Sequence, residues 1–252
     1  NMAAVAAGVT LCIYSVSYAT NNAGSIQQKC RVFITLRIYI CNMKKGIPTL
    51  FIVIICFVTT KAQWVNIPDT AFGSWLKSEY PTCLQGNSGI GWQMDTTCYG
   101  IVTETNVVIV SAPVINLYGV QYFKRLKSLS CINETLQNLP LLPDSLTGLA
   151  CYGNLLITLP ALPATLTYLD CDANDISSLP TLPSGLAKLY CSGNQLSTLP
   201  SLPASLKELR CYRNAITSLP LLPDSIRLLE CYYNNLSSLP KLPDSLLTLT
   251  FH

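Results

Sequence analysis

The stretch LPALPATLTYLDCDANDISS, residues 159–178, contains one cysteine, and counting twenty residues in either direction reaches another. Other residues return at the same interval: leucines before the cysteine, an asparagine three positions after it, and an L-P-x-L-P segment further on. A fixed period with recurring chemistry is typical of a chain that stacks copies of one structural unit. The cysteines in this register are Cys131, Cys151, Cys171, Cys191, Cys211 and Cys231.

Each repeat reads, with small variations, L-x-x-L-x-C-x-x-N-x-L-x-x-L-P-x-L-P-x-S, which matches the leucine-rich repeat at the short end of its length range. We therefore expect a repeat solenoid: a right-handed leucine-rich-repeat coil with a parallel β-sheet on its concave face. The prolines remove backbone donors and fix φ, so the convex segments should be extended and polyproline-like. The repeats begin at Leu126, Leu146, Leu166, Leu186, Leu206, Ile226 and Leu246.

The recurring cysteines are predicted to be a structural core ladder, because a free cysteine behaves as a small buried hydrophobe. Disulfides within the ladder are an alternative, although parallel side chains point the same way and pairing would twist the sheet. No metal is expected there, since a metal site needs converging ligands. The asparagines should bond backbone groups at the turn that leaves each strand, and Glu134 replaces the first. They are Asn154, Asn174, Asn194, Asn214 and Asn234.

The N-terminal region has the pattern of an export signal. Residues 1–62 hold six of the sixteen basic residues and no acidic one. A basic start at Met43, the apolar run LFIVIICFV and small residues before Gln63 predict a signal peptide at 43–62. We interpret residues 1–42 as an upstream or mis-assigned extension, with a transit peptide or membrane-proximal segment as the alternative. The protein should be secreted or on the cell surface, and should meet a membrane only through export or surface attachment.

The remaining chain is predicted to hold an N-terminal cap at 63–106 and the solenoid at 107–252. The sequence NIPDTAFGSWLK reads as a helix with Asp69 at its N-cap. Cys83 and Cys98 lie outside the ladder, and export favours a disulfide between them over two free thiols. Because no polar terminal unit follows the last repeat before His252, we expect a truncated gene product or a fragment.

Alternate strand residues should project onto the concave face as a ligand-binding surface rich in tyrosine. Rigid amphipathic rings beside charges are typical of interfaces, although tyrosine also tolerates exposed strand positions. A protein or peptide ligand is expected, with a glycan as an alternative. The candidate residues are Tyr152, Tyr168, Asp170, Asp172, Tyr190, Glu208, Arg210, Tyr212, Arg213, Arg227, Glu230, Tyr232 and Tyr233, with Asp175 beside them.

Other functions find little support in the composition. The chain's one histidine is His252, so a Ser-His-Asp or Cys-His arrangement has no suitable base, and no catalytic residue or cofactor is expected. The stretch DCDAND begins like a calcium loop, but Asp175 and Thr181 stand where glycine and glutamate are needed. From Gln63 onward ten basic residues face thirteen acidic ones without a basic stripe, so nucleic acid is not an expected partner.

The L-P-x-L-P repeat with its cysteine, together with NIPDTAF and INLYGVQYFKRLKSLSC, resembles exported bacterial leucine-rich-repeat proteins of the internalin-like surface or secreted family. The resemblance covers roughly residues 64–252 and implies protein binding or adhesion. The repeat is also similar to that of injected bacterial effectors, in some of which it selects substrates for a ubiquitin-ligase domain. A structural surface protein is a third alternative.

Overall fold

The structure, a computed structural model, describes residues 5–6, 9–10, 62–109 and 113–251. The chain forms two compact units, Asn1–Cys56 and Phe57–His252. In the first, β1 (Val5–Ala6) and β2 (Val9–Thr10) form an antiparallel pair. The expected signal peptide at 43–62 lies outside the described residues except for its last one, and therefore stays a prediction. In the described part of the chain, no helix combines the length and apolar character needed to cross a bilayer.

The second unit begins with a small mixed cap. Its three strands form an antiparallel sheet in the order β3-β5-β4, and the sequence analysis did not predict this sheet. The helix α1 contacts all three strands. The cap elements are β3 (Trp64–Ile67), α1 (Thr70–Glu79), β4 (Leu84–Asn87), β5 (Gly91–Asp95) and the short helix α2 (Tyr99–Thr103).

Asp69 fixes both the start of α1 and its attachment to the first coil. Its Oδ1 accepts a hydrogen bond from the Phe72 backbone N–H at 2.8 Å, which is the expected N-cap. Its Oδ2 accepts bonds from the backbone N–H groups of Ile115 and Asn116 at 2.7 and 2.9 Å. Phe72 and Leu76 are fully buried on the inner side of the helix.

A disulfide joins Cys83 to Cys98 across the cap, with their Cα atoms 5.5 Å apart. It links the residue before β4 to the N-cap of α2. Within β4, Gly86 has φ 95°, and a Cβ there would lie 2.1 Å from the carbonyl oxygen of Gly91 at the start of β5. Only glycine fits that position.

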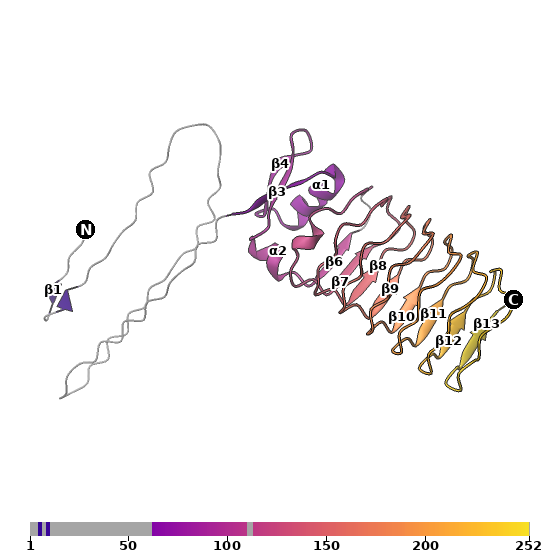
Figure 1. The fold of residues 1–252 in the computed structure, drawn as a ribbon. Coiled ribbons are helices and arrows are strands. Elements are labelled where there is room, and N and C mark those ends of the chain that lie inside the picture. Colours follow the sequence, from indigo (N-terminus) through magenta and orange to yellow (C-terminus); the bar gives the residue numbers. More distant parts are fainter. Residues whose placement is uncertain (1–4, 7–8, 11–61, 110–112, 252) are drawn as a thin grey trace, which may run out of the picture. The chain divides into compact units, whose positions relative to one another are not determined.

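The rest of the unit is a row of coils stacked in sequence order (Figure 1). One eight-stranded sheet runs β6 to β13, and each strand pairs in parallel with the next. The 3-10 helix η1 (Val120–Tyr122) precedes the second strand. The strands are β6 (Asn106–Ile109), β7 (Ser128–Cys131), β8 (Gly148–Ala150), β9 (Tyr168–Asp170), β10 (Lys188–Tyr190), β11 (Glu208–Arg210), β12 (Leu228–Glu230) and β13 (Thr248–Thr250).

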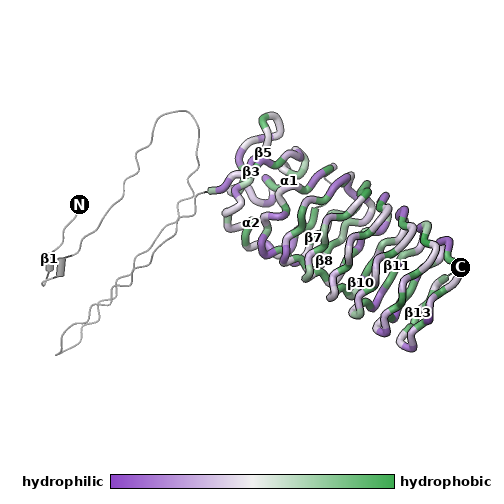
Figure 2. The backbone as a smooth tube through the Cα atoms, in the orientation of Figure 1, coloured by the Kyte–Doolittle hydropathy of each residue, from purple (hydrophilic) through white to green (hydrophobic). Residues whose placement is uncertain are grey.

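The register of the sheet repeats the period of the sequence. Leu129 pairs with Leu149, and the same position pairs onward through Leu169, Leu189 and Leu209. These leucines form a buried line along the solenoid, and hydrophobic positions return in every coil (Figure 2). The L-P-x-L-P segments carry no regular secondary structure, as their prolines require. The predicted fold class, a leucine-rich-repeat solenoid with a parallel sheet, is confirmed.

All six ladder thiols lie in this core. They are free of disulfides and at most 1% exposed. The Cys171 Sγ donates to the Tyr190 carbonyl of the next coil at 3.4 Å, and Cys191 makes the same contact with Arg210. Burial raises the pKa of Cys131 to about 12 and that of Cys231 to about 11, so these thiols stay protonated and unreactive at neutral pH.

The recurring asparagines hold successive coils together. The Asn154 Oδ1 accepts from the Leu136 N–H of the preceding coil at 3.1 Å, while its Nδ2 donates to the Cys131 and Cys151 carbonyls at 2.8 and 3.0 Å. The same pattern returns at Asn174, Asn194, Asn214 and Asn234. Each side chain therefore satisfies backbone groups in two coils at once.

A second polar ladder lies on the opposite side of each coil. The Ser145 Oγ donates to the Leu126 carbonyl at 2.7 Å, and Thr165 and Ser205 bond the equivalent carbonyls of their preceding coils. Ser225 and Ser245 do the same. In the sequence, this second ladder corresponds to the serine that ends the repeat consensus.

Candidate ligand-binding face

The outward side chains of the strands form three columns on the concave face. Their register follows from the strand pairing and from backbone bonds such as that of the Gly193 N–H to the Tyr212 carbonyl. The first column contains Ser128, Gly148, Tyr168, Lys188, Glu208, Leu228 and Thr248. The middle column contains Ser130, Ala150, Asp170, Tyr190, Arg210, Glu230 and Thr250. The last column, directly after each cysteine, contains Ile132, Tyr152, Asp172, Ser192, Tyr212 and Tyr232.

An aromatic and ionic network covers β9 to β12 in the first two columns. The Tyr168 and Tyr190 rings meet edge to face with centroids 5.7 Å apart. The Arg210 guanidinium carbon lies 4.4 Å from the centroid of the Tyr190 ring, and its Nε is 3.2 Å from a Glu230 carboxylate oxygen. One arginine thus joins a ring on one strand to an acid two strands away.

Glu208 connects the same network to Lys188. The Tyr190 hydroxyl donates to the Glu208 carboxylate, and the Lys188 Nζ lies 2.9 Å from it. Partial burial, followed by the bond to Glu208, raises the pKa of Tyr190 to about 12. Burial alone would raise the pKa of Glu208, but the Tyr190 hydroxyl and the Lys188 ammonium lower it overall. Glu208 is therefore ionised at neutral pH.

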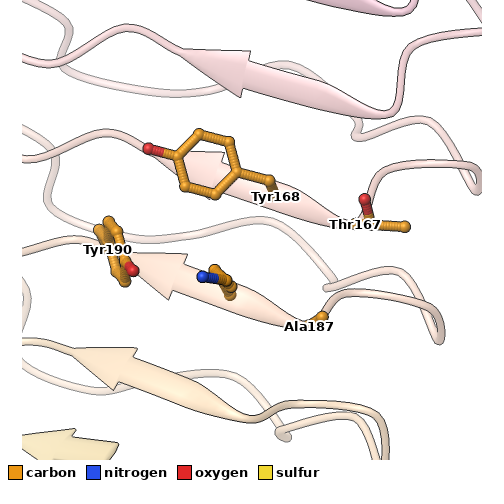
Figure 3. Close-up of a pocket in the computed structure, with 5 residues that line it drawn as sticks. Thr167, Tyr168, Ala187 and Tyr190 are labelled. Carbon is orange, nitrogen blue, oxygen red and sulfur yellow. The ribbon is translucent and has the colours of Figure 1, made fainter.

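A shallow open hollow lies beside this network. It is lined by Thr167, Tyr168, Ala187, Lys188 and Tyr190. Figure 3 shows the Tyr168 ring lying along β9 and the Tyr190 ring standing at the end of β10. The hollow is a surface feature between two rings, suited to contact with another side chain rather than to enclosure of a small molecule.

Three tyrosines gather at the C-terminal end of the last column. Tyr212 and Tyr232 stack with ring centroids 4.6 Å apart and an interplanar angle of 5°. Tyr233 meets Tyr232 edge to face at 5.2 Å, and the Arg213 guanidinium carbon lies 5.7 Å from the Tyr233 ring centroid. Arg213 and Tyr233 follow the last-column residues Tyr212 and Tyr232, and both have left-handed backbone with φ of 55° and 52°. This turn places them next to the column rather than in it.

Two carboxylates occupy the middle of the face. Asp170 is 9% exposed and accepts bonds from the Tyr168 hydroxyl at 3.1 Å and the Asp172 N–H at 3.2 Å. The Asp172 Oδ1 accepts from the Ser192 N–H at 2.5 Å. Burial is the main reason that the pKa of Asp172 rises to about 6; the Asp170 carboxylate adds to the rise, and the Ser192 N–H and the charge of Arg210 oppose it.

Most of the candidate residues share this face, but they do not form one site. Tyr152 stands at the N-terminal end of the last column, apart from the ring cluster. Arg227 is exposed before β12 at the other edge of the sheet, and Asp175 is exposed after the turn, where it accepts from Gln195 at 3.0 Å. Sequence reasoning missed Lys188, although its place between Tyr168 and Glu208 in the first column was the available signal. Among the described residues no group of three or more metal-ligating side chains converges.

No family model and no curated protein match the chain. Several solved structures do match it. YopM from Yersinia enterocolitica is 37% identical with a TM-score of 0.51, covering 51% of this chain and 29% of that one. YopM from Yersinia pestis, described as a leucine-rich effector protein, is 31% identical with a TM-score of 0.51, covering 58% and 47%. The InlJ functional domain from Listeria monocytogenes, described as including a cysteine ladder, is 25% identical with a TM-score of 0.51, covering 72% and 46%.

These likenesses agree with the fold. All three structures are bacterial leucine-rich-repeat proteins, and they support the place of this chain among proteins of that class. The matched part spans less than half the length of each of them. What the neighbours suggest in common is a protein-interaction module.

Proposed function

We propose that the chain is a non-catalytic module that binds a protein or peptide ligand with its concave face. The observation that carries the proposal is the network of half-buried rings and paired charges on the outward side of β9 to β12. The core does not need these side chains, because leucines and cysteines fill the inward side. Half-buried tyrosines held by neighbours lose little conformational freedom on binding, which favours affinity.

Export is the second part of the proposal. The signal-like segment at 43–62 supports secretion or surface display, and the free thiols do not oppose it, because they are buried from oxidants. The partner is then a protein or glycan outside the producing cell. The paired charges of β10 to β12 leave no uniform basic surface for a nucleic-acid backbone.

The test replaces Tyr190, Tyr212 and Tyr232 together by alanine and measures affinity for a purified ligand that the immobilised wild-type protein retains. We expect the affinity to fall at least about a hundredfold, since central interface tyrosines each contribute on the order of 2 kcal/mol. The thermal midpoint should barely move. The matched control replaces Leu141 and Leu221, which are 72% and 84% exposed in the convex segments. If binding survives the tyrosine changes, the concave face is not the binding surface.

A second candidate is the substrate-recognition part of a bacterial effector, including the ubiquitin-ligase type. The observation that favours it is the 37% and 31% identity to the two YopM proteins. Deleting residues 43–62 distinguishes the two. A surface or secreted protein loses general export, whereas an injected effector keeps its delivery. Ubiquitin transfer by the complete gene product would favour the ligase-linked reading.

A further inference from the structure

The concave face changes character between β8 and β9. Over β7 and β8 the first and middle columns carry small side chains; this small-residue floor is Ser128, Ser130, Gly148 and Ala150. Over β9 the same columns carry Tyr168 and Asp170. A Cβ added to Gly148 would meet no atom closer than Cδ1 of the Tyr168 ring, at 3.8 Å. The floor is therefore open above, and the Tyr168 ring borders it along one side.

Acidic groups lie along this border. We call Tyr152, Tyr168, Asp170 and Asp172 the acidic step. The ion pairs of the described residues are Lys188 with Glu208 and Arg210 with Glu230, so neither aspartate has one. Arg210 is close enough to act on the charge of Asp172, but its guanidinium is engaged by Glu230 and the Tyr190 ring. Two neighbouring carboxylates with little water and no paired cation favour an incoming positive charge.

Two side chains lie beside Asp172. Ser192 is buried, and both its N–H and its hydroxyl act on the Asp172 carboxylate. Tyr152 precedes Asp172 in the last column, and the Gly153 N–H bonds the Asp172 carbonyl, which sets the two coils in register. Tyr152 is half-buried and is the neighbour of Asp172 in this column, so its ring is a candidate partner for a cation held at Asp172.

Charge restricts where a basic group can dock. Three exposed basic residues lie one position before their strands: Lys127, Lys207 and Arg227. Asp172 follows its strand, so it lies near the other end of the parallel strands. A cationic side chain is repelled near these basic residues and attracted at the acidic step. The floor, in contrast, offers no charge and no bulky side chain in its two columns, so an extended backbone can approach it closely.

We infer that the concave face binds an extended segment of a partner protein, which crosses the small-residue floor and places a lysine or arginine at the acidic step. This inference rests on the proposed function and names its ligand chemistry. The basic side chain lies against the Asp172 carboxylate and the Tyr152 ring, and Tyr168 packs along the segment. The tyrosine cluster at Tyr212 and Tyr232 then contacts a neighbouring part of the same partner.

The experiment selects displayed short random peptides on the whole protein and measures the affinity of the enriched sequences. We expect a lysine or arginine at one position of these peptides. Replacing it by norleucine or citrulline should weaken binding about tenfold or more. Asp172→Asn should cause the same loss, and the two changes together should cost little more than either alone, as a double-mutant cycle requires of a direct pair.

Two substitutions of equal size test the floor. Ala150→Tyr places on β8 the residue that β10 carries at Tyr190 in the same column, so the fold accommodates it. It should remove binding by filling the floor. Ala161→Tyr, at an exposed convex position, should leave binding unchanged. Thermal unfolding of both variants shows whether the solenoid is intact.

The outcomes separate the two proposals. One outcome is that the peptides bind the Asp172→Asn and Ala150→Tyr variants as tightly as the wild type but fail to bind the variant that lacks Tyr190, Tyr212 and Tyr232. That result would overturn the inference and leave the proposed function standing. Peptides that bind regardless of every concave substitution contradict both. Failure to enrich any peptide, or enrichment without a basic residue, also overturns the inference.

Discussion

Replacing Asn174 by alanine tests the claim that the asparagines hold the coils together. The Asn174 Oδ1 accepts from the Leu156 N–H at 3.1 Å, and its Nδ2 donates to the Cys151 and Cys171 carbonyls at 3.0 and 3.1 Å. The side chain is 7% exposed, so water cannot easily replace it. The substitution would leave the Leu156 N–H without a partner. The Cys151 and Cys171 carbonyls would each lose one of two bonds, because Asn154 and Asn194 still donate to them.

The expected cost follows from these bonds. An unsatisfied buried donor costs about 1–3 kcal/mol, and each bond lost from a carbonyl that keeps another costs about 0.5–1.5 kcal/mol, so we expect a loss of about 2–4 kcal/mol. This is a large part of the stability of a domain of this size. Urea unfolding followed by circular dichroism measures the loss, and hydrogen exchange should show the Leu156 amide opening first.

The control is Asn235→Ala, at the position directly after Asn234, the last asparagine of the ladder. Asn235 is exposed, and its backbone N–H, which the substitution keeps, bonds the Ile216 carbonyl. This substitution should alter the free energy of unfolding by no more than about 0.5 kcal/mol. A cost below about 1 kcal/mol for Asn174→Ala would refute the reasoning, because it would mean that water or relaxation satisfies the backbone as well as the amide does.

Three further predictions concern backbone strain, the cap and pH. Ala173 has φ 51° and Gly193, its equivalent in the next coil, has φ 61°, so Ala173→Gly should stabilise and Gly193→Ala destabilise the protein by about 1 kcal/mol each in urea unfolding. The reasoning requires that the two substitutions change the free energy of unfolding in opposite directions. Replacing both Cys83 and Cys98 by alanine opens a loop of sequence separation 15 and should cost about 3 kcal/mol, measured by unfolding of the cap with and without reductant. The pKa of Asp172, about 6, lies above its unfolded value of about 3.9, so the folded state holds this proton more tightly and stability falls as pH rises from about 4 to about 6. Asp172→Asn should flatten that part of the stability–pH curve, and an unchanged slope would contradict the assignment.

The sequence predicted the positions that stacking controls. A coil that repeats every twenty residues brings like residues together, so the burial of Cys171 and the role of Asn174 follow from the period. The period could not show that the serine at position 145 bonds the preceding coil, because that depends on how the turn before each strand is closed. The cap has no repeat, and its hairpin between β4 and β5 depends on glycine turns rather than on hydrophobic alternation.

The candidate face shows the same division. The columns could be listed from the alternation of strand residues, and the tyrosines were found that way. Which long side chains touch depends on rotamers: Arg210 reaches Tyr190 and Glu230 but leaves Asp170 without an ion pair. The small-residue floor carries no such sequence signal, because Gly148 and Ala150 matter through the space they leave rather than through groups that bind.

Asp69 has a consequence for how the cap is joined to the solenoid. One of its oxygens caps α1 at Phe72, and the other accepts bonds from the backbone N–H groups of Ile115 and Asn116. A single carboxylate therefore couples the start of the helix to the attachment of the first coil, and its removal would release both contacts at once.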